Sequence, residues 1–229
     1  MKRVKISLIL NLINVAFILF AIIAMMTGFY FMGDKTALSL EGYSAFQFFT
    51  FDSNLLAGII SLIYSIYLIL LLKGKIDEIP KVIHIVKYLA TVAVSLTMVT
   101  VVFYLAPFAS SSYFILFTNS NLFFHLISPL LAIITFIWFD KYMKMGKKVC
   151  LLSALPTVFY GIYYYIVVLT HMENGVVDVK YDWYTFAQGG VASIIISTLV
   201  MIFVTISLGW IIYLFNKMFN KRSGEENDK

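Results

Sequence analysis

Long apolar runs alternate with short polar segments along the whole chain, and this alternation is the main structural signal. A helix needs about 20 apolar residues to cross a bilayer. Six runs are long enough, and the predicted spans are 6–31, 45–72, 82–108, 118–139, 149–170 and 190–216. The pattern therefore predicts an all-α, polytopic membrane protein, built as a bundle of six transmembrane helices.

The composition agrees with this pattern. Of the 229 residues, 61% are hydrophobic and 13% are charged, whereas a soluble domain is nearer half apolar and a quarter charged. The connecting loops are short, so we expect one membrane domain over residues 1–222 and a disordered cytoplasmic tail at 223–229. The single cysteine, Cys150, cannot form an internal disulfide.

The basic residues gather on one side of the predicted membrane. Only two of the 17 lysines and arginines, Lys35 and Lys180, fall on the other side. The positive-inside rule then places both termini in the cytoplasm, which agrees with an even number of spans. The expected location of this multi-pass protein is the plasma membrane. The positive charge is explained by topology, so no nucleic-acid partner is expected.

Polar residues in the second span share one helical face. At 100° per residue, they lie within a sector of about 60°. They are Gln47, Thr50, Asn54, Ser61 and Ser65. Asp52 lies roughly 200° from Thr50 around the axis, so it must face another helix, a water cavity or the headgroups.

The fourth span carries a matching polar face. Its members, at spacings of 3, 4 and 3, are Thr118, Asn121, His125 and Ser128. Thr50 and His125 would lie roughly 8 and 10 Å below the outer ends of their spans. The two faces are therefore expected to meet in one pocket that opens outward. Pro129 has no N–H for the carbonyl of His125, so the turn of the histidine should be locally opened.

A hydroxyl beside an imidazole is the minimum for covalent acyl transfer, because histidine can take the proton of a threonine nucleophile. Thr50 and His125 supply these groups. Four residues are candidate oxyanion donors by type: Asn54, Asn121, Tyr160 and Tyr164. The alternative is structural: Thr50 bonds its own helix backbone, and His125 bonds Asn54 across the interface.

The remaining polar groups carry weaker signals. His84 is expected to be a solvated residue at the cytoplasmic end of its span, and His171 a headgroup-level residue that begins the last outer loop. No lysine is expected deep in a span, which disfavours a retinal Schiff base. Only Asp52 and His125 are expected to be ionisable within spans, which is thin evidence for a transporter.

The histidines lack metal-ligand spacing, so neither a metal nor another cofactor is expected. Four aromatic residues in the last outer loop are expected to form an interfacial belt. They are Tyr181, Trp183, Tyr184 and Phe186.

Two short motifs resemble known membrane proteins. The elements are Phe49-Thr50-Phe51 followed by Ser53-Asn54-Leu55-Leu56, and Asn121-x-x-x-His125-x-x-x-Pro129. They resemble the proteorhodopsin-related family of bacterial six-span proteins. They are also similar, more distantly, to the androgen-induced and androgen-dependent membrane threonine hydrolases, whose substrates are fatty acid esters of hydroxy fatty acids.

This resemblance implies Thr50 as nucleophile and His125 as base in a hydrolase of fatty acyl esters, with a pocket open to the outer leaflet. The chain departs from the hydrolases at two points. The histidine precedes the proline by four residues rather than five, and Trp183-Tyr184-Thr185-Phe186 lacks the proline of their aromatic loop. The alternative function is non-catalytic binding of a lipid or small ligand, or an accessory subunit; membrane lipid is the expected partner in every case.

Overall fold

The computed structural model describes residues 1–32, 42–109, 112–140 and 146–225. Within them, six helical segments are long and apolar enough to cross a membrane, which confirms the predicted number of spans. These segments are Lys2–Thr27, Phe49–Leu72, Lys81–Phe108, Ser120–Phe139, Val149–Thr170 and Gly190–Asn220. The protein is therefore a mostly helical, multi-pass membrane protein.

Two of the spans change helical geometry along their length. The third consists of α3 (Lys81–Thr100), a π-helical turn η2 (Val101–Leu105) and a 3₁₀ turn η3 (Ala106–Phe108). The fourth consists of α4, η5, α5 and η6, of which η5 and η6 are π-helical turns. Their bounds are Ser120–Leu122, Phe123–Ile127, Ser128–Ile134 and Thr135–Phe139. The π-helical turns widen the helix locally, and turns of this kind are frequent at functional sites.

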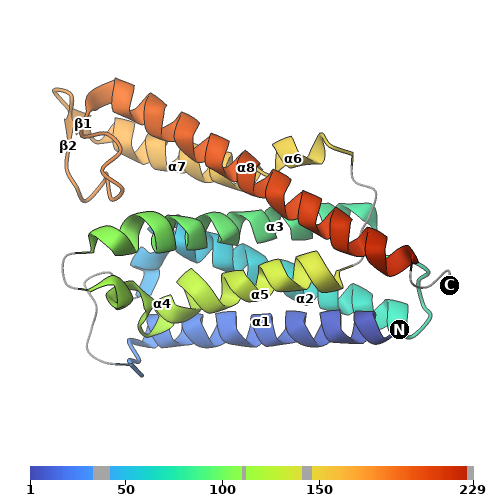
Figure 1. Ribbon diagram of the computed structural model, residues 1–229. Helices are drawn as coiled ribbons and strands as arrows, with labels where there is room; N and C mark the ends of the chain where they lie inside the picture. Colours follow the sequence, from blue (N-terminus) through green and yellow to red (C-terminus); the bar gives the residue numbers. More distant parts are fainter. Residues whose placement is uncertain (33–41, 110–111, 141–145, 226–229) are drawn as a thin grey trace.

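The other elements complete the bundle (Figure 1). They are α1 (Lys2–Thr27), the 3₁₀ helix η1 (Gly42–Gln47), α2 (Phe49–Leu72), the 3₁₀ helix η4 (Tyr113–Phe117), α6 (Val149–Leu152), α7 (Leu155–Thr170) and α8 (Gly190–Glu225). Between α7 and α8, β1 (Met172–Glu173) and β2 (Val176–Val177) form a small antiparallel hairpin, with Met172 opposite Val177. In Figure 1, α7 and α8 lie on one side of α3, and α1 lies on the other.

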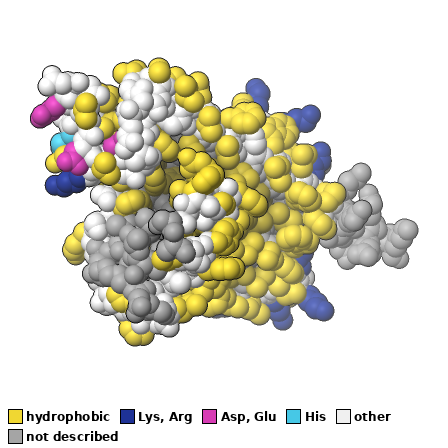
Figure 2. Space-filling view, turned by 60° about the vertical axis from the view of Figure 1, so that its left-hand side comes forward, with side chains coloured by type: hydrophobic (Ala, Val, Ile, Leu, Met, Phe, Trp, Pro, Cys, Tyr) yellow, Lys and Arg dark blue, Asp and Glu magenta, His cyan; other side chains and the backbone are white. Residues whose placement is uncertain are grey.

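Both ends of the chain lead to the same end of the bundle, because α1 starts and α8 finishes there (Figure 1). Figure 2 shows a broad belt of hydrophobic side chains between this end, where most of the visible lysines and arginines lie, and an opposite end with acidic side chains. α8 runs as far as Glu225, which is beyond the predicted start of the tail at 223; residues 226–229 lie outside the described part.

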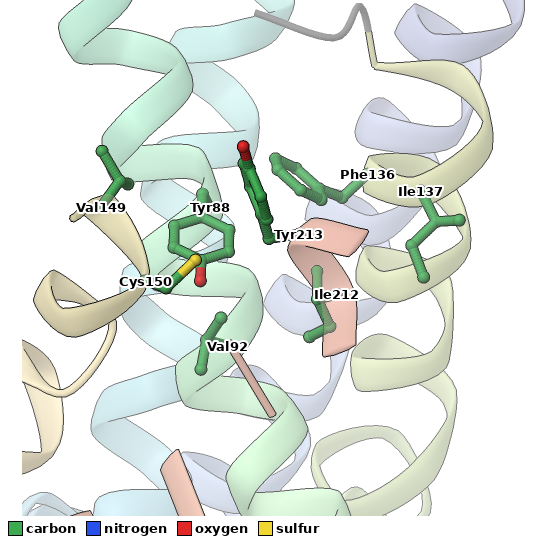
Figure 3. Packing of buried hydrophobic residues seen from close by; sticks show 8 residues of the cluster. All are labelled: Tyr88, Val92, Phe136, Ile137, Val149, Cys150, Ile212 and Tyr213. Carbon is green, nitrogen blue, oxygen red and sulfur yellow. The ribbon is translucent and has the colours of Figure 1, made fainter. Parts of the chain in front are cut away.

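The core between α3, η6, α6 and α8 is built from buried apolar and aromatic side chains (Figure 3). They are Tyr88, Val92, Phe136, Ile137, Val149, Cys150, Ile212 and Tyr213. Gly209 lets α8 approach this core closely, because a Cβ at this position would overlap the side chain of Ser153 and the hydroxyl of Tyr88. This packing holds the C-terminal half of α8 against the bundle.

Candidate functional site

The start of the second span is irregular, and this changes the placement of its polar face. Phe48 has an extended backbone (φ −107°, ψ 131°), so α2 begins only at Phe49 and Gln47 belongs to η1. The expectation that Gln47 shares a helical face with Thr50 and Asn54 is therefore wrong. Thr50 lies in the first turn of α2, nearer the end of the span than its predicted depth.

Asn54 joins the second span to the fourth. Its buried side-chain amide donates to the carbonyl of Thr50 at 2.8 Å and to the carbonyl of Phe124 at 3.0 Å. Phe124 precedes His125 in η5. One amide from the polar face of α2 therefore connects the turn of Thr50 to the turn of His125.

His125 is held in a defined orientation. It is buried, and its Nδ1 lies 2.7 Å from the carbonyl oxygen of Leu116 in η4. Because a carbonyl only accepts hydrogen bonds, Nδ1 carries the proton, and the lone pair of the neutral ring is on Nε2. The widened turn η5 lies immediately before Ser128 and Pro129, where the sequence predicts an opened helix. Among the described residues, the predicted alternative bond from His125 to Asn54 is not formed.

The structure brings the turns of Thr50 and His125 together without a direct bond between them. Within the described part of the chain, no hydrogen bond links the Thr50 hydroxyl to the imidazole. Two buried polar atoms of the same two sequence motifs have no hydrogen-bond partner among the described residues. They are the amide nitrogen of Asn121 and the amide oxygen of Asn54. Buried groups of this kind are uncommon and often belong to binding or catalytic sites.

The hydroxyl groups of the two candidate tyrosines already donate hydrogen bonds within the protein. Tyr160 donates to the carbonyl of Gln47 at 2.5 Å and accepts from the indole N–H of Trp183 at 3.0 Å. Tyr164 donates to the carboxylate of Asp182, which is buried. Of the four candidate donors, Asn121 alone keeps a buried and unpartnered N–H group among the described residues.

The aromatic residues of the last loop contact the start of α2. The hydroxyl of Tyr184 accepts a hydrogen bond of 3.0 Å from the backbone N–H of Phe49, the first residue of α2. The loop therefore caps the helix that carries Thr50. Asp52 lies in the same first turn of α2 and is half-buried. His171 is exposed and stacks on Tyr181, with ring centroids 3.7 Å apart.

Near the end of the bundle that carries both chain ends, the structure corrects two expectations. Lys87 is only 2% exposed inside the third span, although no lysine was expected deep in a span. His84 is buried rather than solvated, and its Nδ1 lies 3.2 Å from the hydroxyl of Tyr64. The ionisable groups inside the bundle are therefore more numerous than Asp52 and His125.

Helical spacing offered a signal for this second polar region. Polar residues recur every three or four positions on α1 and on α3 and are buried in both helices. They are Ser7, Asn11 and Asn14 on α1, and Lys87, Thr91 and Ser95 on α3. The same spacing argument that selected Thr50 and His125 predicts that these faces point inward.

The described residues contain no cluster of three or more His, Cys, Asp or Glu side chains that could hold a metal ion. The geometry thus defines a six-span membrane protein with a buried imidazole, a threonine hydroxyl and unpaired amides at one end. No known protein family, curated protein or solved structure matches the chain.

Proposed function

We propose that the protein is a plasma-membrane hydrolase of fatty acyl esters, in which Thr50 is the nucleophile and His125 the base. The orientation of His125 is the observation that carries this proposal. Its Nδ1–H donates a hydrogen bond to the carbonyl of Leu116. The basic Nε2 is therefore the ring nitrogen that can accept the proton of the nucleophile. A third group that orients the base in this way is typical of nucleophile–base pairs.

The reaction follows from these groups. Nε2 of His125 takes the proton of the Thr50 hydroxyl while the oxygen attacks the ester carbonyl carbon. The N–H of Asn121 stabilises the resulting oxyanion. The imidazolium then protonates the departing alcohol, which leaves an acyl-threonine ester, and a water activated by the same imidazole releases the fatty acid. Hydrogen bonds that are absent in the free enzyme often form only with substrate bound.

A fluorophosphonate probe tests the proposal. The purified full chain should be labelled at Thr50, and Thr50→Ala should abolish both labelling and hydrolysis of long-chain esters. His125→Gln should slow hydrolysis by about 10²–10⁴-fold, which is the contribution of a general base. Thr170→Ala is the matched control, since among the described residues that exposed hydroxyl bonds only its own helix and the adjacent His171. The proposal is overturned if the folded protein is neither labelled nor able to hydrolyse the esters. It is also overturned if the Thr50→Ala variant is still labelled.

The second candidate is non-catalytic binding of a lipid or small ligand, including a role as an accessory subunit. Two observations among the described residues favour this second candidate. Thr50 and His125 share no hydrogen bond, and the hydroxyls of Tyr160 and Tyr164 already donate to other groups of the protein. A photoactivatable fatty acyl ester distinguishes the two functions. Under this second candidate it should crosslink to the bundle and remain uncleaved, and Thr50→Ala should leave the crosslinking yield unchanged.

We also propose that both termini lie in the cytoplasm and that the candidate site faces outward. The distribution of basic residues supports this orientation. In intact cells, a cysteine at Asp178 should react with an impermeant maleimide and one at Lys75 should not. The native Cys150 is buried and should add little background. The reverse pattern of labelling would invert the orientation.

A further inference from the structure

A chain of buried polar side chains connects α1, α2 and α3 near the end of the bundle where α1 begins. The ammonium group of Lys87 donates to the amide oxygen of Asn11 at 2.6 Å and to the hydroxyl of Ser61 at 2.8 Å. All three residues are almost fully buried. A lysine in such a place is expensive to bury and marks a functional site by default.

Asp140 extends this chain to the end of the fourth span. One carboxylate oxygen accepts a hydrogen bond of 2.6 Å from the hydroxyl of Ser7, and Asn11 in turn donates to the carbonyl of Ser7 at 2.9 Å. The second oxygen, Oδ2, is buried and has no hydrogen-bond partner among the described residues. Arg3 donates to the main-chain carbonyls of Phe139 and Asp140, both at 3.3 Å, so it closes this end of the cluster.

The cluster thus holds a carboxylate with one unsatisfied oxygen beside two cations. No described lysine or arginine nitrogen lies within ion-pair distance of that carboxylate; its direct partner is the Ser7 hydroxyl. A buried anionic oxygen without a donor is destabilising, and the usual remedy is to neutralise it or supply a ligand. A metal cation is disfavoured because Lys87 and Arg3 already place positive charge next to the site. A proton is the ligand that neutralises the charge at Oδ2 without adding bulk.

We propose that Asp140 is a proton-binding site, in which Oδ2 takes up a proton from the aqueous phase next to Arg3 while Lys87, Asn11 and Ser7 set its affinity. This site is separate from Thr50 and His125, and its existence does not depend on the proposed hydrolase activity. Binding forms an O–H bond at Oδ2 and removes the negative charge that Lys87 and Arg3 share. The contact between α1 and the fourth span is therefore the part of the fold that responds to the proton.

The charged and titratable groups around Asp140 act in opposite directions. Burial raises the pKa of Asp140 to about 6. The nearby Lys87, the side chains of Ser7 and Asn11 as hydrogen-bond donors, and the guanidinium of Arg3 oppose this shift. Tyr64 faces the site from α2, and His84 from α3 bonds to that tyrosine. Because the folded-state pKa is raised from 3.8, the native state binds the proton more tightly than the unfolded chain does. The stability that this site contributes is complete below the unfolded value and is lost as the pH rises through about 6.

Infrared difference spectroscopy on the full chain in lipid nanodiscs tests the proposal. When the pH is lowered from about 8 to about 5, across the raised pKa, the carbonyl band of a protonated carboxylic acid should appear. Asp140→Asn should remove one component of that band. Asp52→Asn is the matched control, because Asp52 lies at the opposite end of α2, and this variant should keep the Asp140 component.

Two further variants keep the test decisive if Asp140→Asn does not fold. Ser7→Ala removes the hydrogen bond to the ionised form, and Lys87→Met removes the nearest positive charge in the network. Each should move the midpoint of the band to a higher pH by about one unit, since each change favours the neutral acid. An unchanged midpoint in both variants, or a wild-type band that Asp140→Asn leaves intact, overturns the proposal.

Discussion

Lys87→Met is the most informative test of how this bundle is held together. Methionine keeps the length and most of the volume of the side chain but removes the ammonium group. The change leaves the amide oxygen of Asn11 and the hydroxyl of Ser61 without their donor. It also removes one of the two cations beside the buried carboxylate of Asp140 and leaves Arg3 as the other.

The expected magnitude follows from these contacts. A hydrogen bond to a charged group contributes about 1.5–3 kcal/mol to stability, and Lys87 makes two, at 2.6 and 2.8 Å. The variant no longer pays the desolvation of the ammonium group, which offsets part of this loss. We therefore expect a net destabilisation of about 3 kcal/mol, at the lower end of the range for removing one partner of a buried charge network.

Thermal unfolding in detergent at about pH 7, above the raised pKa of Asp140, measures this effect. Lys81→Met is the matched control on the same helix, because Lys81 is exposed; it should change stability by less than about 0.5 kcal/mol. The double variant Lys87→Met with Asp140→Asn should lose less than the sum of the single losses, since it leaves no uncompensated buried charge. Equal stability of Lys87→Met and Lys81→Met, or strict additivity in the double variant, would refute the reasoning.

Three further substitutions probe other contacts. Asn54→Leu should destabilise the fold by about 1 kcal/mol, because it removes the amide that joins α2 to η5; an unchanged unfolding temperature would contradict this. Gly209→Ala should destabilise by about 1–3 kcal/mol through overpacking, whereas Gly161→Ala, where the added Cβ meets nothing closer than 4.0 Å, should have a smaller effect. Tyr164→Phe should speed hydrogen exchange in the loop around Asp182, because the loop loses its buried tie to α7; unaltered exchange there would show that the tie is dispensable.

The spans could be predicted well because lipid leaves the backbone little choice. Within a bilayer every N–H and C=O must be satisfied inside the segment, so an apolar run of sufficient length forms a helix. The fifth span was predicted at 149–170 and is observed over Val149–Thr170. The start of the second span was less predictable, because Phe48 is as apolar as its neighbours and only its extended backbone separates η1 from α2.

Periodicity also placed Asn54 on an inward face of α2, and its amide bonds to the main chain of the fourth span. It could not assign partners to individual polar atoms. The hydroxyls of Tyr160 and Tyr164 are taken by a backbone carbonyl and by Asp182, and both partners come from segments outside α7. Such pairings depend on how loops fold back over the bundle, which hydropathy does not encode.

The sequence by itself therefore determined the class of this protein, the number of its spans, and which faces of the second and fourth spans carry buried polar residues. The tertiary structure decided what each polar group does. It gave His125 a carbonyl partner, and it buried Lys87 and Asp140 in one network although they are far apart in the chain. The physical reason is that burial in lipid is a property of segments, whereas the pairing of charges and hydrogen bonds depends on which helices become neighbours.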